Sequence, residues 1–351
     1  MRSAIVGLSL LFGACTEPLA APTLDPDPAI RASATSAEKI SNAIGAGLQG
    51  DARRAVALLR TVDPIALDGR DQQYRSCMLE RFGSARPLAS ARGNDSAFAS
   101  RVVEIYQRYW RRSLKAPESR HRHTKELEQA LRQHMRLPDG TDSVAIERAL
   151  RARLEAQGLH ALLGQTGVLR ELMIWRREER RSETVEMPHG TYSTDVAFLD
   201  DFVVTGWGQF ATCETRGAGG WVADKTLFAV VPIYEDLEGE EFRVTFLGHE
   251  TQHFLDLEQF PDMAPWELEY RAKLMELAMA QDTRARVLQK FIEDQGDDPS
   301  SHHSYANRKV LRVLMGELSA PSPTSLLSVN GQSLRDAAYR LFKSDTAMRD
   351  R

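Results

Sequence analysis

From Ser36 to about Gly158 the apolar residues of this chain recur at intervals of three and four, which is the spacing of amphipathic helices. Near Leu169 this spacing gives way to short apolar runs separated by turn residues, which are typical of β-strands. The chain has 351 residues, of which 42% are hydrophobic and 27% are charged, so it is long enough for one large domain or two medium ones and too apolar for a disordered protein. The sequence therefore predicts an α+β protein, with a helical bundle over residues 36–165 and a domain with a small mixed sheet and further helices over residues 166–351.

The helical region contains six candidate helices, several of them preceded by Ser or Asp residues that cap helix N-termini. They are Ser36 to Ala46, Asp51 to Val62, Arg70 to Phe82, Ser96 to Ser113, Thr124 to Arg136 and Ser143 to Gln157. In the second region we expect strands at Leu172 to Trp175, Thr184 to Met187, Tyr192 to Leu199, Phe202 to Thr205 and Thr226 to Tyr234, with a turn at Pro188-His189-Gly190. Helices are expected again at Glu241 to Glu258 and Pro265 to Ala280, followed by another helix that ends at Glu293. Two more are expected at His303 to Glu317 and around Leu334 to Phe342.

The N-terminus has the layout of a secretory signal peptide. Arg2 supplies a positive charge, an apolar run ends at Phe12, and two small residues lead to Cys15. Leu11-Phe12-Gly13-Ala14-Cys15 resembles a bacterial lipobox, although Phe12 stands where Leu is usual. The resemblance implies that residues 1–14 are a signal peptide and that residues 15–35 are a lipidated N-terminus and linker. An ordinary cleaved signal or a buried apolar strand are the alternatives.

The chain has 3 Cys, so lipidation of Cys15 leaves Cys77 and Cys213 as one pair in an oxidising envelope. A disulfide between them is the simple expectation, and two free buried thiols are the alternative. Because one cysteine lies in each half of the chain, such a bridge would tie the helical half to the mixed half.

His249-Glu250-Thr251-Gln252-His253 carries the strongest chemical signal. Two histidines four residues apart on a helix project from one face and can bind the same metal ion. Glu250 lies between them, where it can take a proton from an activated water and deliver it to a leaving amine. The apolar residues on both sides of the motif support a helix from Glu241 to Glu258, although the same pattern can also arise by chance on a solvated helix face.

Phe246 to Leu255 resembles the active-site helix of the zincin metallopeptidases, a resemblance that covers about Thr226 to Leu277. It implies catalytic Zn²⁺, which normally takes three protein ligands and keeps one position for water. Glu269-Tyr270-Arg271-Ala272 is similar to the gluzincin segment in which a helical Glu completes the site, so Glu269 is the expected third ligand, with Glu267 and Glu276 as alternatives. Lys273 stands where such families often have an Asp that orients a zinc-bound histidine, and Asp256 or Glu276 would have to take that part.

The resemblance also suggests roles for residues around the helix. In zincins the strand before this helix is a sheet edge that pairs with an extended peptide, and Pro232 places Thr226 to Tyr234 at an edge here, although an ordinary protected edge explains it too. Gly219-Gly220-Trp221 is either a rim of the cleft or a turn with a packed Trp. His303 or Tyr305 is the candidate for stabilising the oxyanion, and helix capping is the competing explanation for both.

These observations lead to one functional hypothesis and two alternatives. We expect a zinc-dependent peptidase of the bacterial cell envelope that acts on a peptide or protein substrate, is anchored in the membrane through lipid on Cys15, and faces the periplasm or exterior. A net charge of -4 gives no attraction for nucleic acid, so no nucleic-acid partner is expected. The alternatives are a non-catalytic envelope lipoprotein that binds proteins, and a metal-dependent amidohydrolase with a non-peptide substrate.

Overall fold

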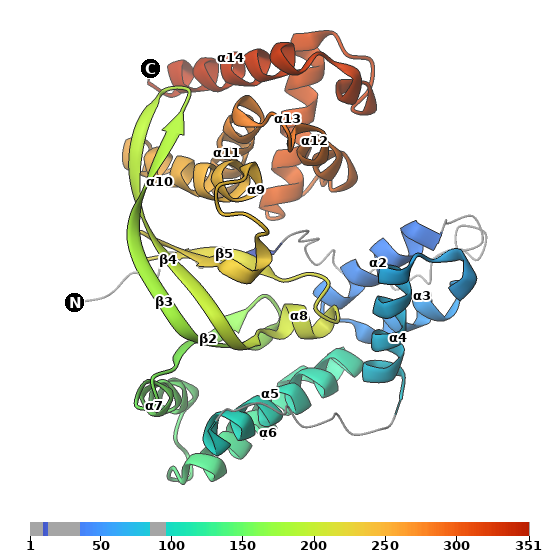
Figure 1. The fold of residues 1–351 in the computed structure, drawn as a ribbon, viewed down its shortest axis with the longest axis vertical. Coiled ribbons are helices and arrows are strands. Elements are labelled where there is room, and N and C mark those ends of the chain that lie inside the picture. Colours follow the sequence, from blue (N-terminus) through green and yellow to red (C-terminus); the bar gives the residue numbers. More distant parts are fainter. Residues whose placement is uncertain (1–9, 13–35, 85–95, 351) are drawn as a thin grey trace. The chain divides into compact units, whose positions relative to one another are not determined.

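The computed structural model describes residues 10–12, 36–84 and 96–350. The chain forms two compact units. The helical unit ends at Glu178 and also includes Leu199–Ala218, and the histidine unit consists of Glu179–Phe198 and the chain from Gly219 onward. This division differs from the boundary expected at residues 165 and 166, because two long strands pass from one unit into the other (Figure 1).

Six helices of the helical unit lie where the sequence predicted them. Their bounds are α2 Ser36–Leu48, α3 Ala52–Arg60, α4 Gly69–Gly83, α5 Ala97–Lys115, α6 Arg120–Met135 and α7 Ser143–Glu155, with short 3-10 turns η1 Pro64–Ala66 and η2 Pro117–Ser119 and a later short helix α8 Trp207–Ala211. Four of the helices begin at a capping side chain: Asp51, Asp68, Ser96 and Asp142 each accept a hydrogen bond from a backbone N–H in the first turn. Apolar periodicity together with these caps explains why the helix positions could be predicted.

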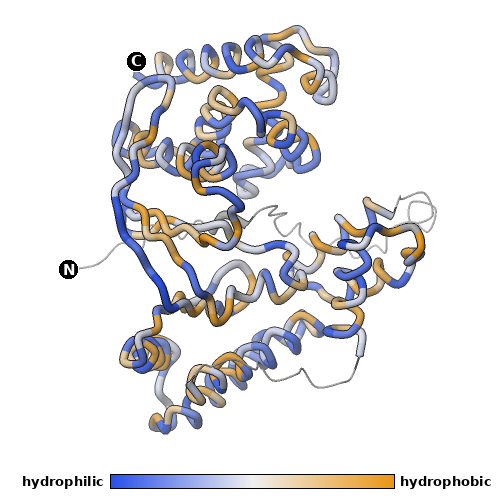
Figure 2. Tube along the Cα trace, in the orientation of Figure 1, coloured by the Kyte–Doolittle hydropathy of each residue, from blue (hydrophilic) through white to orange (hydrophobic). Residues whose placement is uncertain are grey.

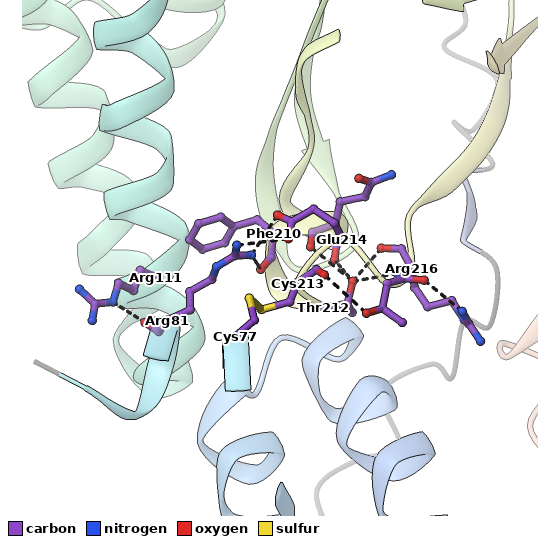
Figure 3. Close-up of a disulfide and its surroundings, with 11 residues drawn as sticks. Cys77, Arg81, Arg111, Phe210, Thr212, Cys213, Glu214 and Arg216 are labelled. Carbon is purple, nitrogen blue, oxygen red and sulfur yellow. Dashed lines mark hydrogen bonds and ion pairs between the residues drawn. A yellow bond between two sulfur atoms is a disulfide. The ribbon is translucent and has the colours of Figure 1, made fainter. Parts of the chain in front are cut away.

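A disulfide links Cys77 on α4 to Cys213, which follows α8 (Figure 3). This is the expected pairing. Both cysteines belong to the helical unit, so the bridge does not tie this unit to the histidine unit, contrary to our expectation. Next to the bridge, Arg81 donates to the carbonyl oxygen of Phe210 at 2.7 Å and pairs with Glu214 at 3.1 Å. The disulfide therefore fastens α8 and the residues after it to α4.

The sheet has six strands in the order β1-β5-β6-β4-β3-β2. Their bounds are β1 Leu10–Phe12, β2 His160–Thr166, β3 Leu169–Met187, β4 Gly190–Thr205, β5 Ala218–Ala223 and β6 Thr226–Val230. β3 and β4 are each one continuous strand where the sequence suggested two short ones, and the predicted turn at Pro188 and His189 joins them. The rest of the predicted signal peptide and linker, including Cys15, lies outside the described residues.

The expected edge strand is not an edge. β6 lies between β5 and β4, and Pro232 lies after the end of the strand, in the 3-10 turn η3 Val231–Ile233. Gly219-Gly220-Trp221 forms neither a rim nor a turn, because it belongs to β5, where Trp221 stacks on Phe228 at 5.3 Å. The proline therefore ends the strand and does not protect an edge, and the neighbouring glycine-rich segment supplies the next strand.

The burial pattern of β3 changes along its length. Glu171 to Trp175 are buried without alternation, whereas Arg176 to Arg181 are mostly exposed and form a hydrophilic stretch (Figure 2). Burial then alternates toward Met187, as expected for a strand with one covered face. The exposed stretch contains the point at which the chain passes between the two units.

The helices of the histidine unit contain the candidate site. Their bounds are α9 Glu240–Phe242, η4 Arg243–Gly248 with π-helical geometry, α10 His249–Gln259, α11 Pro265–Met279, α12 Arg284–Glu293, α13 His302–Leu318, η5 Thr324–Ser328 and α14 Gly331–Arg349. α11 packs against α10, α13 and α14 (Figure 1). Phe242, Phe246, Leu274 and Leu311 belong to the apolar core of this unit. Within the described ranges, no helix combines the length and apolarity needed to cross a bilayer.

Candidate metal centre

Two histidines and a glutamate come together on the facing helices α10 and α11. The candidate ligand atoms of His249, His253 and Glu269 all lie within 4.8 Å of one another, and these side chains are almost entirely removed from solvent. The i and i+4 spacing puts both imidazoles on one face of α10, and their ring centroids are 4.8 Å apart. This group could hold a metal ion.

The helix that carries the histidines is joined to two strands of the sheet, by a contact before the motif and by one within it. Just before it, Arg243 of η4 donates to Oε2 of Glu183 at 2.8 Å and to the carbonyl oxygen of Thr184 at 2.7 Å, on β3. Within it, the hydroxyl groups of Thr251 and Thr194 share a hydrogen bond of 2.9 Å that joins α10 to β4. The π-helical geometry of η4 ends where the histidines begin, a position at which such turns often accompany functional sites.

The three side chains lie close enough together to bind one metal ion. Nε2 of His253 lies 3.3 Å from Oε1 of Glu269, and Nε2 of His249 lies 3.5 Å from Oε2 of the same carboxylate. These separations exceed the usual N–H···O range of about 2.7 to 3.2 Å. Ligand atoms bound at about 2.0 to 2.1 Å in a tetrahedral zinc site are about 3.3 Å apart. Two imidazoles and a carboxylate at such separations could hold a metal ion.

The side chain of Glu250 is the second feature that suggests a bound ligand beside the two histidines. Its side chain is buried, and within the described ranges neither carboxylate oxygen has a hydrogen-bond partner. Burial raises the pKa of Glu250, and the nearby His253 and His249 only partly oppose that rise. Buried polar atoms are rarely left without a partner, so a carboxylate in this condition is suited to a water or ligand that enters the site.

Glu269 is contacted by two further side chains, His303 and Lys273. Nδ1 of His303 lies 2.8 Å and Nζ of Lys273 lies 3.5 Å from Oε2 of Glu269. Burial alone would raise the pKa of Glu269, but His303, Lys273 and the paired histidines hold it well below its ordinary value. Lys273 is four residues after Glu269 on α11, so helical spacing predicts that the two side chains meet.

The alternatives for the third ligand have other contacts. Glu267 accepts a hydrogen bond from the backbone N–H of Ala264 and pairs with Arg349, which makes it a cap of α11. Glu276 approaches the opposite side of His249, with its Oε2 3.4 Å from Nδ1. Burial alone would lower the pKa of His249, but Glu269 and Glu276 together raise it to about 9. Of the two acids expected to orient a histidine, Glu276 is therefore the one that lies beside His249.

The structure brings only one of the two expected oxyanion residues to this group. His303, at the start of α13, contacts Glu269, whereas the ring of Tyr305 packs on Trp266 at 5.2 Å with Lys309 above it. Tyr234 was missed by the sequence analysis as a neighbour of Glu250. Burial raises the pKa of Tyr234, and the negative charge of Glu250 adds to that rise.

The hydroxyl group of Tyr234 donates to the carbonyl oxygen of Gly219 at 3.0 Å. A Cβ atom at position 219 would lie 2.6 Å from this hydroxyl, so any larger residue there would require the Tyr234 side chain to shift. Gly219 thus leaves room for the hydroxyl group of Tyr234. The contact between Tyr234 and Gly219 could have been predicted from the sequence only if the pairing of β5 with β6 were known.

A second group of candidate ligand types, Cys77, Cys213 and Glu214, offers no thiolate because its cysteines form the disulfide. Among the described residues, the group that could hold a metal ion is therefore His249, His253 and Glu269. Comparison of the chain with protein-family models, with curated proteins and with solved structures found no match.

Proposed function

We propose that this chain is a zinc-dependent peptidase of the bacterial cell envelope. The observation that carries the proposal is the buried Glu250 carboxylate, which has no hydrogen-bond partner in the described residues and lies on the same helix as the histidine pair. A group placed purely for stability would be paired, because an unpaired buried carboxylate is costly. An unpaired carboxylate beside a candidate metal group is the arrangement that a general base requires.

Each residue of the centre has a part in this proposal. His249, His253 and Glu269 would hold Zn²⁺, which supplies a Lewis acid for the scissile carbonyl and acidifies water when it is bound. Glu250 takes the proton of the attacking water and passes it to the leaving amine. Burial favours this because it raises the pKa of Glu250 and so makes the carboxylate a stronger base.

His303 is the residue we assign to the oxyanion. Its Nδ1 atom lies 2.8 Å from Oε2 of Glu269, and with Nδ1 turned toward that carboxylate, Nε2 would be the donor toward the substrate. The ring is about a quarter exposed, with 27% of its side-chain surface open to solvent, so a substrate can reach it. Tyr305, which packs on Trp266, has no part in this assignment.

The envelope location rests on the sequence alone. A signal peptide that ends before Cys15 would deliver the chain across the inner membrane, and lipid on Cys15 would anchor it so that it faces the periplasm or exterior. The Cys77–Cys213 disulfide is compatible with this proposal, because disulfides persist in oxidising compartments. The substrate would then be a peptide or protein of the same compartment.

The test compares the wild type with Glu250→Gln, after both are supplied with zinc, on an unstructured protein and a peptide library. We expect Glu250→Gln to bind zinc normally and to lose about 100-fold to 10,000-fold in kcat, the usual contribution of a general base. Glu258→Gln is the matched control, because Glu258 is an exposed carboxylate on the same helix and should retain full activity.

Other outcomes would separate the alternative functions. Equal cleavage by wild type and Glu250→Gln would contradict the proposal. Zinc binding without peptide cleavage, but with hydrolysis of a non-peptide amide that depends on Glu250, would favour an amidohydrolase. A wild type that binds no zinc and cleaves nothing would favour a protein-binding lipoprotein.

A further inference from the structure

His253 and Asp256 lie three residues apart on α10, so their side chains are neighbours on one face of the helix. Within the described residues, Nδ1 of His253 is buried and has no hydrogen-bond partner, and the same holds for Oδ2 of Asp256. One atom is a potential donor and the other an acceptor. No hydrogen bond joins these two atoms among the described residues, so one water molecule or a change of side-chain rotamer would let them satisfy each other.

The other oxygen of Asp256 is held by a chain of charged groups. Oδ1 accepts hydrogen bonds from Gln252 at 2.9 Å and from Nε of Arg271 at 2.8 Å. Both Arg271 and Asp256 are 1% exposed. Arg271 also donates to Oδ2 of Asp345 on α14 at 2.7 Å, and Arg349 donates to the same oxygen at 2.8 Å.

The guanidinium group of Arg271 is fixed in position by more than its ion pairs. It lies over the ring of Phe342 at 4.2 Å, also on α14, and over the ring of Phe260 at 5.5 Å. A planar guanidinium group with two carboxylate partners and two aromatic neighbours has little freedom to move. The Asp256 carboxylate is therefore held in one orientation on α10.

We propose that Asp256 orients His253 for metal binding and that Arg271 and Asp345 hold Asp256 for this purpose. The C-terminal helix α14 would then support the metal centre through Asp345, Arg271 and Asp256. The inference rests on the proposed metal site. Together with Glu276 at His249, it gives each metal-binding histidine its own outer carboxylate, one from α11 and one from α10.

The test measures the zinc affinity of the folded protein by competition with a chromophoric chelator. Asp256→Asn should weaken zinc binding about 10-fold to 100-fold, the usual effect of losing an outer partner of a metal-binding histidine. Asp345→Asn should weaken it less, because Arg271 keeps its bond to Asp256. Glu317→Gln is the control: it removes the exposed Arg340–Glu317 ion pair between α13 and α14 and should leave zinc affinity unchanged.

A second readout separates orientation from simple stability. In the zinc-loaded wild type, the Nδ1 proton of His253 should give a downfield resonance typical of a hydrogen bond to a carboxylate, and Asp256→Asn should shift it upfield. A merely structural network would lower the melting temperature of the metal-free variants and leave both the zinc affinity and this resonance unchanged. That result would overturn the inference.

The experiment distinguishes an error in the role of Asp256 from an error in the metal site itself. If the wild type binds no zinc, the metal site itself is wrong. If the wild type binds zinc tightly and Asp256→Asn binds it equally well, only the support through Asp256 is wrong. Should Asp256→Asn fail to fold, Asp345→Asn decides the question by the same two readouts, because it leaves the buried Arg271–Asp256 pair in place.

Discussion

Oε2 of Glu276 lies 3.4 Å from Nδ1 of His249, on the side of the ring opposite to Glu269. Glu269 and Glu276 are seven residues apart on α11, which is about two helical turns, so they lie on the same face of that helix. One helix thus contributes both a candidate metal ligand and the carboxylate that orients another ligand. Lys273 lies between them on the same helix and contacts Glu269.

Glu276→Gln should weaken zinc binding. The carboxylate favours the tautomer of His249 that keeps Nε2 free for the metal, and an amide does so less strongly. Losing such a partner typically costs about 10-fold to 100-fold in metal affinity. The measurement is the zinc dissociation constant, with Glu258→Gln as the control on α10. Equal affinities of wild type and Glu276→Gln would remove Glu276 from the account of the site.

Glu250→Gln should stabilise the metal-free protein at neutral pH. The pKa of Glu250 is raised by burial, so in the unfolded chain the carboxyl group loses its proton at lower pH than in the folded protein. Between the ordinary pKa of a glutamate and the raised one, the unfolded state binds fewer protons, and the free energy of unfolding therefore falls as pH rises.

The variant has no ionisable group at this position, so its free energy of unfolding does not fall with pH for this reason. Its stability should exceed that of the wild type by about 1 to 3 kcal/mol above the raised pKa, the penalty typical of an unsatisfied buried polar group. Below the ordinary pKa of glutamate the difference should vanish. Urea unfolding of the metal-free proteins at several pH values measures it. A variant that is less stable than the wild type at neutral pH would indicate that Glu250 is a structural residue.

Removing the disulfide should destabilise the helical unit. Cys77 and Cys213 are separated by 136 residues, so the bridge restricts a long loop of the unfolded chain. Replacing both with Ala should lower the free energy of unfolding by about 2 to 5 kcal/mol, as measured by chemical denaturation. Zinc affinity should not change, because the candidate ligands all belong to the histidine unit. A variant of unchanged stability would show that the bridge contributes nothing to the fold.

Cys15→Ser should release the protein from the membrane. If Cys15 carries lipid, the wild type sediments with membranes and its mature N-terminal peptide has the mass of an acylated cysteine. The serine variant should appear in the soluble fraction without that mass. Recovery of the unmodified wild type in the soluble fraction would contradict the predicted anchor and leave the metal site untouched.

The predictable parts of the fold depend on short-range patterns. Helices such as α5 and α7 could be placed because apolar spacing and a capping residue, Ser96 or Asp142, agree at the same boundary. The histidine pair could be predicted because its chemistry follows from spacing on a single helix. The position of Glu269 beside the histidine pair depends on the packing of α11 against α10. The sequence indicates this packing only through the resemblance of the segment from Glu269 to Ala272.

The errors have physical causes that a single sequence does not reveal. The exposed residues Arg176 to Arg181 show no apolar alternation, so a strand of 19 residues appeared to be two short ones. Pro232 suggested a sheet edge, but it follows the end of β6. Arg271 is buried among carboxylates on other helices, and a charged residue is expected at the surface unless such partners are known.

Anomalous X-ray diffraction above and below the zinc absorption edge, on crystals of the zinc-loaded protein, tests the central claim most directly. The account predicts one strong zinc peak within about 2.0 to 2.2 Å of Nε2 of His249, Nε2 of His253 and a carboxylate oxygen of Glu269, with Glu250 beside the remaining position. A zinc-loaded crystal with no peak among these three side chains, or with zinc bound only elsewhere, would contradict it.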